Sequence, residues 1–157
     1  MDEMTLARTL HVLGVVLWIG GVGFVTTVLL PSVRQVADPA RRVELFEEIE
    51  RRFAWQARGT TLLVGATGLY LTVTLDLWNR FVEAQFWWMH AMILVWLVFS
   101  VMLFVAEPLF LSRWFRRAAS ARPEATFRLI ESLHLALLGI SLLTVAGAVA
   151  GSHGSAF

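Results

Sequence analysis

One stretch decides the fold class of this chain: residues 6–30 read LARTLHVLGVVLWIGGVGFVTTVLL. Only Arg8 and His11 within it can carry a charge. The stretch exceeds the roughly 20 residues that a helix needs to cross the hydrocarbon core of a bilayer. It is preceded by the acidic leader Met1-Asp2-Glu3-Met4, whereas a cleavable signal peptide has a basic leader and a shorter apolar run. We therefore expect a permanent transmembrane helix here.

Three more apolar stretches of similar length follow, at about residues 55–77, 86–111 and 127–150. Overall, 57% of the residues are hydrophobic and 16% are charged, whereas soluble domains average about 45–50% and about 25%. The sequence predicts an all-α integral membrane protein: a four-helix antiparallel bundle forming one domain over residues 1–157. The chain has no cysteine, which excludes disulfides, thiolate catalysis, iron–sulfur clusters and covalent c-type haem.

Arginine is concentrated in two of the connections between these stretches. The first connection contains Arg34, Arg41, Arg42, Arg51 and Arg52, and the third contains Arg113, Arg116, Arg117 and Arg122. The turn at residues 79–85 has only Arg80. Positive residues favour the cytoplasmic side of a membrane. We therefore expect a multi-pass protein of the bacterial inner (cytoplasmic) membrane with both termini outside.

The first connection has helical features of its own. Asp38-Pro39 is a typical helix start, with a capping side chain followed by proline at the first helical position. The spacings Glu47 to Arg51 and Glu48 to Arg52 place opposite charges one turn apart. The pattern predicts a cytoplasmic amphipathic helix at about residues 39–53 that lies on the bilayer or runs into the second span.

Three histidines, His11, His90 and His134, fall inside the apolar stretches, where an ionisable side chain needs a partner. His11 and His90 lie near the outer ends of two spans that run in the same direction, roughly 6–8 Å below the outer surface. Imidazoles at matching depth can ligate one b-type haem iron from both faces, and Gly14, one turn from His11, leaves room for a flat cofactor. The alternative is that each histidine is a hydrogen-bonding contact between helices.

His134 lies nearer the cytoplasmic half of the fourth span, one turn after Glu131. Arg58 and Glu107 fall near the inner ends of the second and third spans. These four residues predict an inner polar cluster, which would hold haem propionates, relay protons or bind a quinone head group. Two alternatives stay open: the cluster is a structural ion-pair network, or His134 is itself an axial ligand.

Residues 10–21, LHVLGVVLWIGG, resemble the first helix of the HemJ family of bacterial protoporphyrinogen oxidases and of CopD-like copper-resistance proteins. Trp88-Met89-His90-Ala91-Met92 is similar to the third helix of the same group. The HemJ resemblance implies a b-type haem with His11 as a ligand, and an oxidoreductase acting on protoporphyrinogen IX. This chain departs from the family at Met92, where HemJ-type helices carry a lysine. The resemblance therefore implies the haem more directly than the enzyme activity.

The CopD resemblance implies movement of copper across the membrane instead. The residues themselves offer a copper site as well, because Met89, His90 and Met92 are close together and thioether plus imidazole suits Cu(I). In this alternative His11 joins them and His153 helps to capture the ion. The sequence as a whole predicts a membrane b-type haem protein in electron transfer or porphyrin/quinol redox chemistry, with the lipid bilayer and a quinone or porphyrin as partners. Copper transport and a non-catalytic membrane scaffold are the alternatives. No residue is identified as catalytic, no nucleic acid is expected, and a homodimer is left open.

Overall fold

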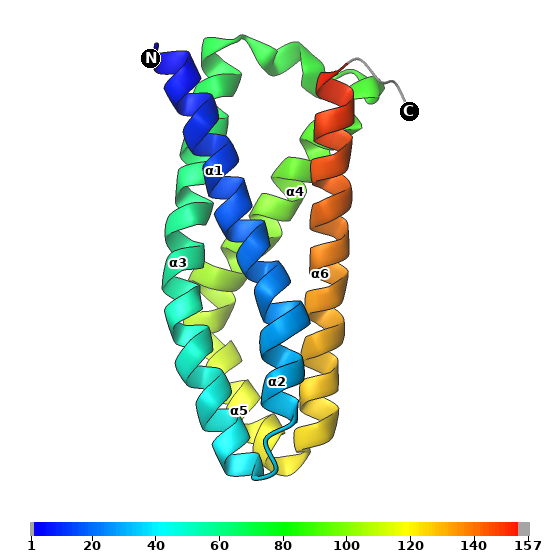
Figure 1. Ribbon diagram of the computed structural model, residues 1–157. Helices are drawn as coiled ribbons and strands as arrows, with labels where there is room; N and C mark the ends of the chain where they lie inside the picture. The colour runs from blue at the N-terminus through cyan, green and yellow to red at the C-terminus, as the bar shows by residue number, and fades with distance from the viewer. Residues whose placement is uncertain (1, 154–157) are drawn as a thin grey trace.

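The computed structural model describes residues 2–153, and these residues form helices and turns with no β-strand. The helices join into four long segments (Figure 1). The first contains α1 (Glu3–Phe24), the π-helix η1 (Val25–Leu29) and α2 (Leu30–Arg34), and the second is α3 (Pro39–Thr74). The third contains α4 (Trp87–Val101), the π-helix η4 (Met102–Leu111) and α5 (Ser112–Ala121), and the fourth is α6 (Pro123–Ser152). The short 3₁₀ helices η2 (Leu77–Phe81) and η3 (Ala84–Phe86) connect α3 to α4.

Consecutive segments run in opposite directions, so α1 begins and α6 ends at the same end of the molecule (Figure 1). The most extensive contact is between α1 and α3, and α4 lies mainly against α6. Within residues 2–153, three segments are long and apolar enough to cross a membrane, namely Glu3–Arg34, Ala84–Ala121 and Pro123–Ser152. Their surfaces are apolar too: Val16 is 60% exposed and Leu143 is 70% exposed. Contiguous apolar surface of this kind is typical of contact with lipid or another protein.

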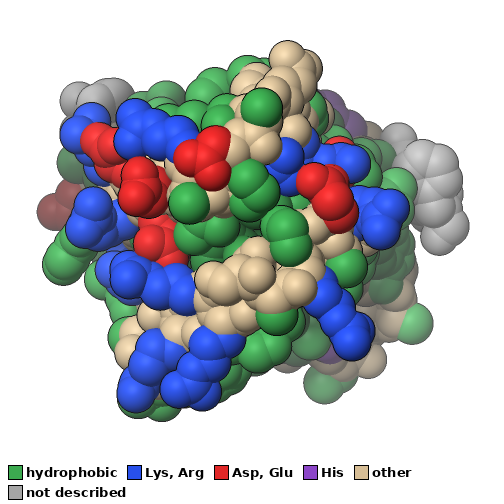
Figure 2. All heavy atoms as spheres, turned by 90° about the horizontal axis from the view of Figure 1, so that it is seen from below, with side chains coloured by type: hydrophobic (Ala, Val, Ile, Leu, Met, Phe, Trp, Pro, Cys, Tyr) green, Lys and Arg blue, Asp and Glu red, His purple; other side chains and the backbone are tan. Residues whose placement is uncertain are grey.

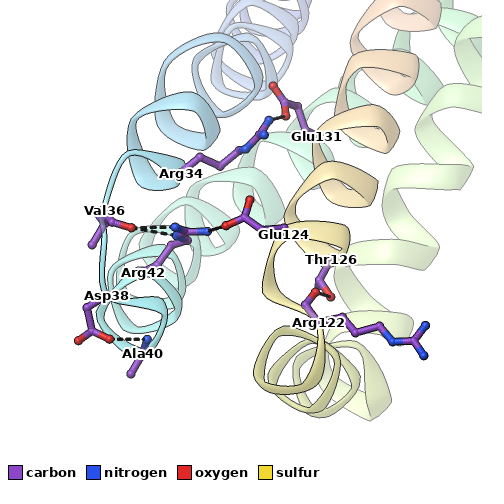
Figure 3. A network of polar contacts seen from close by, with 9 residues as sticks. All are labelled: Arg34, Val36, Asp38, Ala40, Arg42, Arg122, Glu124, Thr126 and Glu131. Carbon is purple, nitrogen blue, oxygen red and sulfur yellow. Dashed lines mark hydrogen bonds and ion pairs between the residues drawn. The ribbon is translucent and has the colours of Figure 1, made fainter.

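The predicted amphipathic helix and the predicted second span are one continuous helix, α3. Its start is confirmed: the Asp38 carboxylate accepts a hydrogen bond from the Ala40 N–H at 3.1 Å, and Pro39 is the first helical residue (Figure 3). The Glu48–Arg52 ion pair is also present, at 3.3 Å. The Glu47–Arg51 pair is not, because Glu47 pairs with Arg116 of α5 at 2.8 Å.

The arginine-rich end is held together by apolar packing and by ion pairs. An apolar cluster there contains Val25, Leu29, Leu30, Val33, Phe46, Phe115, Ala119 and Phe127. The buried Arg42 guanidinium donates to the Val36 carbonyl and to Glu124, and Arg34 pairs with Glu131 (Figure 3). These contacts join α2 and α3 to α6 without leaving the Arg42 charge unpaired.

Tryptophans of α4 occupy the space beside glycines of its neighbours. A Cβ atom on Gly65 of α3 would lie 2.6 Å from the Trp96 ring, and one on Gly147 of α6 would lie 2.6 Å from the Trp87 ring. Gly151 of α6 is in still closer contact with the Trp88 ring. The Trp96 indole N–H also donates to the Thr61 carbonyl at 2.9 Å. Small residues therefore allow bulky rings to pack between helices, as they often do in membrane proteins.

Candidate functional site

His11 lies half-buried on α1 and faces α3. Its Nδ1 is 3.0 Å from Thr67 Oγ1, and that hydroxyl is 2.6 Å from the Leu63 carbonyl oxygen. A hydroxyl has one proton, and a carbonyl can only accept. Thr67 therefore donates to Leu63 and accepts from His11, so the His11 proton is on Nδ1. The lone pair on Nε2 is left free, as in histidines that bind metals through Nε2.

Gly68 of α3 has no side chain, which allows the His11 ring to lie close to α3. A Cβ atom on Gly68 would lie 3.2 Å from His11 Cε1, closer than most real Cβ contacts. Gly14, which the sequence placed beside the cofactor, instead lies against Val64, 2.8 Å from where its Cβ would be. The space next to Gly14 is thus filled by the contact between α1 and α3, and Gly68 is the glycine that makes room at His11.

His90 is held by different elements. It is exposed on α4, and its Nε2–H donates to the Phe81 carbonyl of η2 at 3.0 Å. The Phe81 ring meets the imidazole edge-on, with centroids 5.7 Å apart. His90 therefore has only Nδ1 free and shares no contact partner with His11. No contact joins His90 to His11 among these hydrogen bonds, and the two-sided haem clamp that their matching depth predicts stays a prediction.

His134 resembles His11 in its hydrogen bonding. Its Nδ1–H donates to the Ile130 carbonyl at 2.9 Å, which leaves Nε2 free. The two residues lie at different levels, however. The helices α1 and α6 begin at opposite ends of the molecule. His11 is about 12 Å along α1 from its start at Glu3, and His134 is about 16 Å along α6 from its start at Pro123. They are thus placed as separate sites rather than as a pair.

The predicted inner cluster of four residues divides into separate contacts. Arg58 pairs with Glu107 at 2.7 Å, whereas Glu131 pairs with Arg34 of α2. His134 bonds to its own helix. Sequence spacing placed the four residues at a similar depth but did not show which neighbour each helix faces.

Arg58 also satisfies a carbonyl that the π-helix η4 leaves without its donor. In a π-helix the carbonyl of residue 103 would accept from the N–H of residue 108, but residue 108 is proline and has none. The Arg58 Nε–H donates to the Leu103 carbonyl at 3.1 Å, and the Arg58 Nη2 group donates to the Glu107 carboxylate at 2.7 Å. The π-helix was not predicted, and Pro108 inside an apolar stretch was the one sequence signal for it.

Glu50 on the first half of α3 is a further polar group that the sequence analysis missed. Burial, together with repulsion from Glu107 and Glu47, raises the pKa of Glu50 to about 7, although Arg58 acts in the opposite direction. The available signal was the missing partner one turn on: residue 54 is alanine, whereas Glu47 and Glu48 are each followed by arginine. Glu50, Glu107 and Arg58 together form a polar group where α3 meets η4.

Histidine lines neither of two hollows that lie between helices of the bundle. One of about 90 Å³ lies between α4 and α6 and is apolar apart from Ser141. The other, of about 340 Å³, lies between α1–η1 and α3 and includes Arg52 and Gln56. Within residues 2–153 no three His, Asp or Glu side chains are grouped to hold a metal ion. The copper ligands suggested by sequence are also divided, since Met89 is buried and His90 is exposed.

Comparisons with models of protein families, with curated proteins and with solved structures found no match to this chain.

Proposed function

We propose that this chain is a four-span antiparallel bundle in the bacterial cytoplasmic membrane, with both termini outside. Three segments have the length and apolarity of spans, and the fourth span would be the second half of α3. Arginines gather around one end of the molecule, seen from below in Figure 2. The two arginine-rich connections lie at this end, which the positive-inside rule assigns to the cytoplasm.

Within that bundle, we propose a b-type haem with His11 as an axial ligand. The observation that carries the proposal is the bond from His11 to Thr67, because it fixes the proton on Nδ1 and leaves Nε2 available for iron. Gly68 leaves the space in which the imidazole can approach α3 closely. The fit covers one axial position only, since the Nε2 atom of His90 is bonded to a backbone carbonyl.

A bound haem would supply a one-electron redox couple, and the protein would act in electron transfer or in porphyrin/quinol redox chemistry. The contribution of this chain is to orient His11 through Thr67 and to keep its site within an apolar bundle. The resemblance of residues 10–21 to HemJ-type first helices supports the same proposal. Arg58 lies near the middle of α3 and pairs with Glu107 of η4, and neither side chain forms a hydrogen bond or ion pair with His11, so we assign them no part in holding the haem.

The test is the visible spectrum of the protein purified in detergent from haem-supplied cells, oxidised and then reduced with dithionite. We expect a Soret band and sharp α and β bands after reduction. His11→Ala should lose these bands. The control is His153→Ala, because His153 is exposed and bonds only within the last turn of α6. A parent protein without haem bands would overturn the proposal and favour a scaffold.

His90→Ala and His134→Ala identify the second axial position. If His90→Ala changes the spectrum, the Phe81 bond must open when haem binds. If only His134→Ala changes it, the haem lies in the inner half and His11 is a helix contact. If neither changes it while His11→Ala does, His11 is the only histidine ligand.

A further inference from the structure

The cavity between α1–η1 and α3 has the form of a site for an amphipathic molecule. Its volume is about 340 Å³, within the range of small-molecule sites. Its apolar wall consists of Phe24, Val25, Ile49 and Phe53, and Gly21 forms its floor. The Phe53 ring lies directly over Gly21, so any side chain at position 21 would displace the ring. The cavity lies where α1 ends and the π-helix η1 begins.

Arg52 and Gln56 give the same cavity a polar end. They lie one turn apart on α3, so both side chains reach the same edge of the cavity. Arg52 is 81% exposed, and its one ion pair, with Glu48 at 3.3 Å, is of the weak surface kind that exchanges readily. A guanidinium and an amide N–H₂ are therefore available to an incoming anion.

The position of the cavity in the bundle indicates which kind of molecule it would bind. Its polar end lies where the proposed second span of α3 begins, on the arginine-rich side, and Phe24, which also lines the cavity, is 52% exposed. Basic pockets between helices on the cytoplasmic side of membranes bind anionic lipid headgroups. A zwitterionic lipid is less suited, because its own cation would compete with Arg52 for the phosphate.

We propose that this cavity binds an anionic phospholipid of the cytoplasmic leaflet. The phosphodiester would lie between Arg52 and Gln56, and an acyl chain would lie along Phe24, Val25 and Ile49. The proposal rests on the membrane placement given above and is independent of haem.

The test compares phosphatidylglycerol with phosphatidylcholine of identical acyl chains, bound to the detergent-purified full-length protein and counted by native mass spectrometry. We expect the parent to retain phosphatidylglycerol preferentially. Arg52→Gln should weaken phosphatidylglycerol binding about fivefold, the effect of one basic residue at an anionic surface. Arg41→Gln is the matched control: Arg41 is also an exposed arginine of α3 paired with a glutamate at 3.3 Å, but it does not line the cavity.

Equal binding of the two lipids by the parent would overturn the proposal. Equal losses of binding in Arg52→Gln and Arg41→Gln would also overturn it, because general surface charge would then explain the binding.

Gln56→Leu keeps the side-chain size and should also weaken binding, since it removes the amide donor. Inorganic phosphate should not displace the lipid, because it lacks the acyl chain that the apolar wall holds; displacement would make this a simple phosphate site. Recovery of the chain in the soluble fraction without detergent would instead contradict the membrane placement.

Discussion

The hydroxyl of Thr67 determines which nitrogen of His11 can act as a ligand. Its own proton is committed to the Leu63 carbonyl, so it can only accept from the imidazole. This contact joins α1 to α3 whether or not a cofactor is bound, which is why a helix-packing histidine and an axial ligand can look alike in sequence. Substitutions at Thr67 separate the two roles.

We predict that Thr67→Val lowers the haem content of the purified protein about tenfold, because removal of the partner of a ligating histidine typically costs 10–100-fold in affinity. Thr67→Ser keeps the hydroxyl and should retain haem. The measurement is the ratio of Soret to protein absorbance, with heat-unfolding temperatures to confirm that both variants fold. Equal haem content in folded Thr67→Val and Thr67→Ser would show that the contact does not position the ligand.

Glu50 predicts a specific dependence of stability on pH. Its pKa is about 7 in the folded chain against an ordinary 4.5, so the folded state holds this proton to higher pH than the unfolded state does. Stability should therefore fall as pH rises from about 4.5 through about 7. The charged groups that face Glu50 are Glu107 from η4, and Arg58 and Glu47 from its own helix, with Arg116 of α5 paired to Glu47.

Glu50→Gln should remove this dependence and raise the unfolding temperature above pH 7 by about 3 °C or more, equivalent to about 1 kcal/mol. At pH 4.5 the variant and the parent should unfold at similar temperatures. The measurement is heat unfolding in detergent at several pH values. Glu48→Gln is the control, since Glu48 is exposed and its pair with Arg52 is a surface one. A constant difference at every pH would mean that Glu50 does not titrate in this range.

At the scale of elements, the π-helix η4 depends on α3. Arg58 supplies the donor that Pro108 cannot give and pairs with Glu107 in the same contact. We predict that Arg58→Leu destabilises the bundle by about 2 kcal/mol, because it leaves a half-buried carboxylate and a carbonyl without partners. Arg58→Leu combined with Glu107→Leu should recover about half of the loss, measured by heat unfolding. No recovery would mean that the carboxylate is not what Arg58 stabilises.

Pro108→Ala tests the carbonyl half of the same contact. It restores an N–H that can donate to the Leu103 carbonyl, so that carbonyl no longer needs Arg58. In the Pro108→Ala background, the cost of Arg58→Leu should fall by about 1 kcal/mol, the usual worth of one hydrogen bond. An unchanged cost would place the effect of Arg58 entirely in its pair with Glu107.

The sequence predicted which stretches form helices, but it did not predict which helices contact one another. Apolar length alone predicted the helices of residues 6–30, 86–111 and 127–150, which appear as parts of longer segments. Asp38-Pro39 predicted the start of α3 because capping is a local interaction. The partners of Glu47, Glu131 and His90 were missed because they lie on other elements, and the rotation of each helix about its axis is set by packing.

For the molecule as a whole, we predict that a reporter active only in the cytoplasm stays inactive when fused after Phe157. The same reporter fused after Ala37 of a truncated chain should be active, because that position lies in the arginine-rich first connection. The control for expression is a second reporter that works only outside the cytoplasm, which should be active after Phe157 and inactive after Ala37. The reversed result would keep the bundle but exchange its two sides.

The sequence predicted the whole-molecule class from composition, since 57% hydrophobic residues suit lipid better than water. It also identified His11 as the residue to examine. It could not indicate Thr67, Gly68 or the cavity beside Gly21, because each arises where α3 meets α1. The position of a residue along its helix predicts its depth in the bundle. A site also depends on which face of the neighbouring helix lies against that residue, and one helix alone does not show this.

The tryptophans seated over glycines have an optical consequence. Three of the seven tryptophans, Trp87, Trp88 and Trp96, lie on α4 in close contact with α6 or α3. When α4 separates from these neighbours, their indole rings move into a different environment and their emission changes in wavelength and intensity. Fluorescence of the unlabelled protein therefore reports whether α4 is docked, and Gly65→Ala or Gly147→Ala, which push the rings out, should reproduce part of that signal in the folded chain.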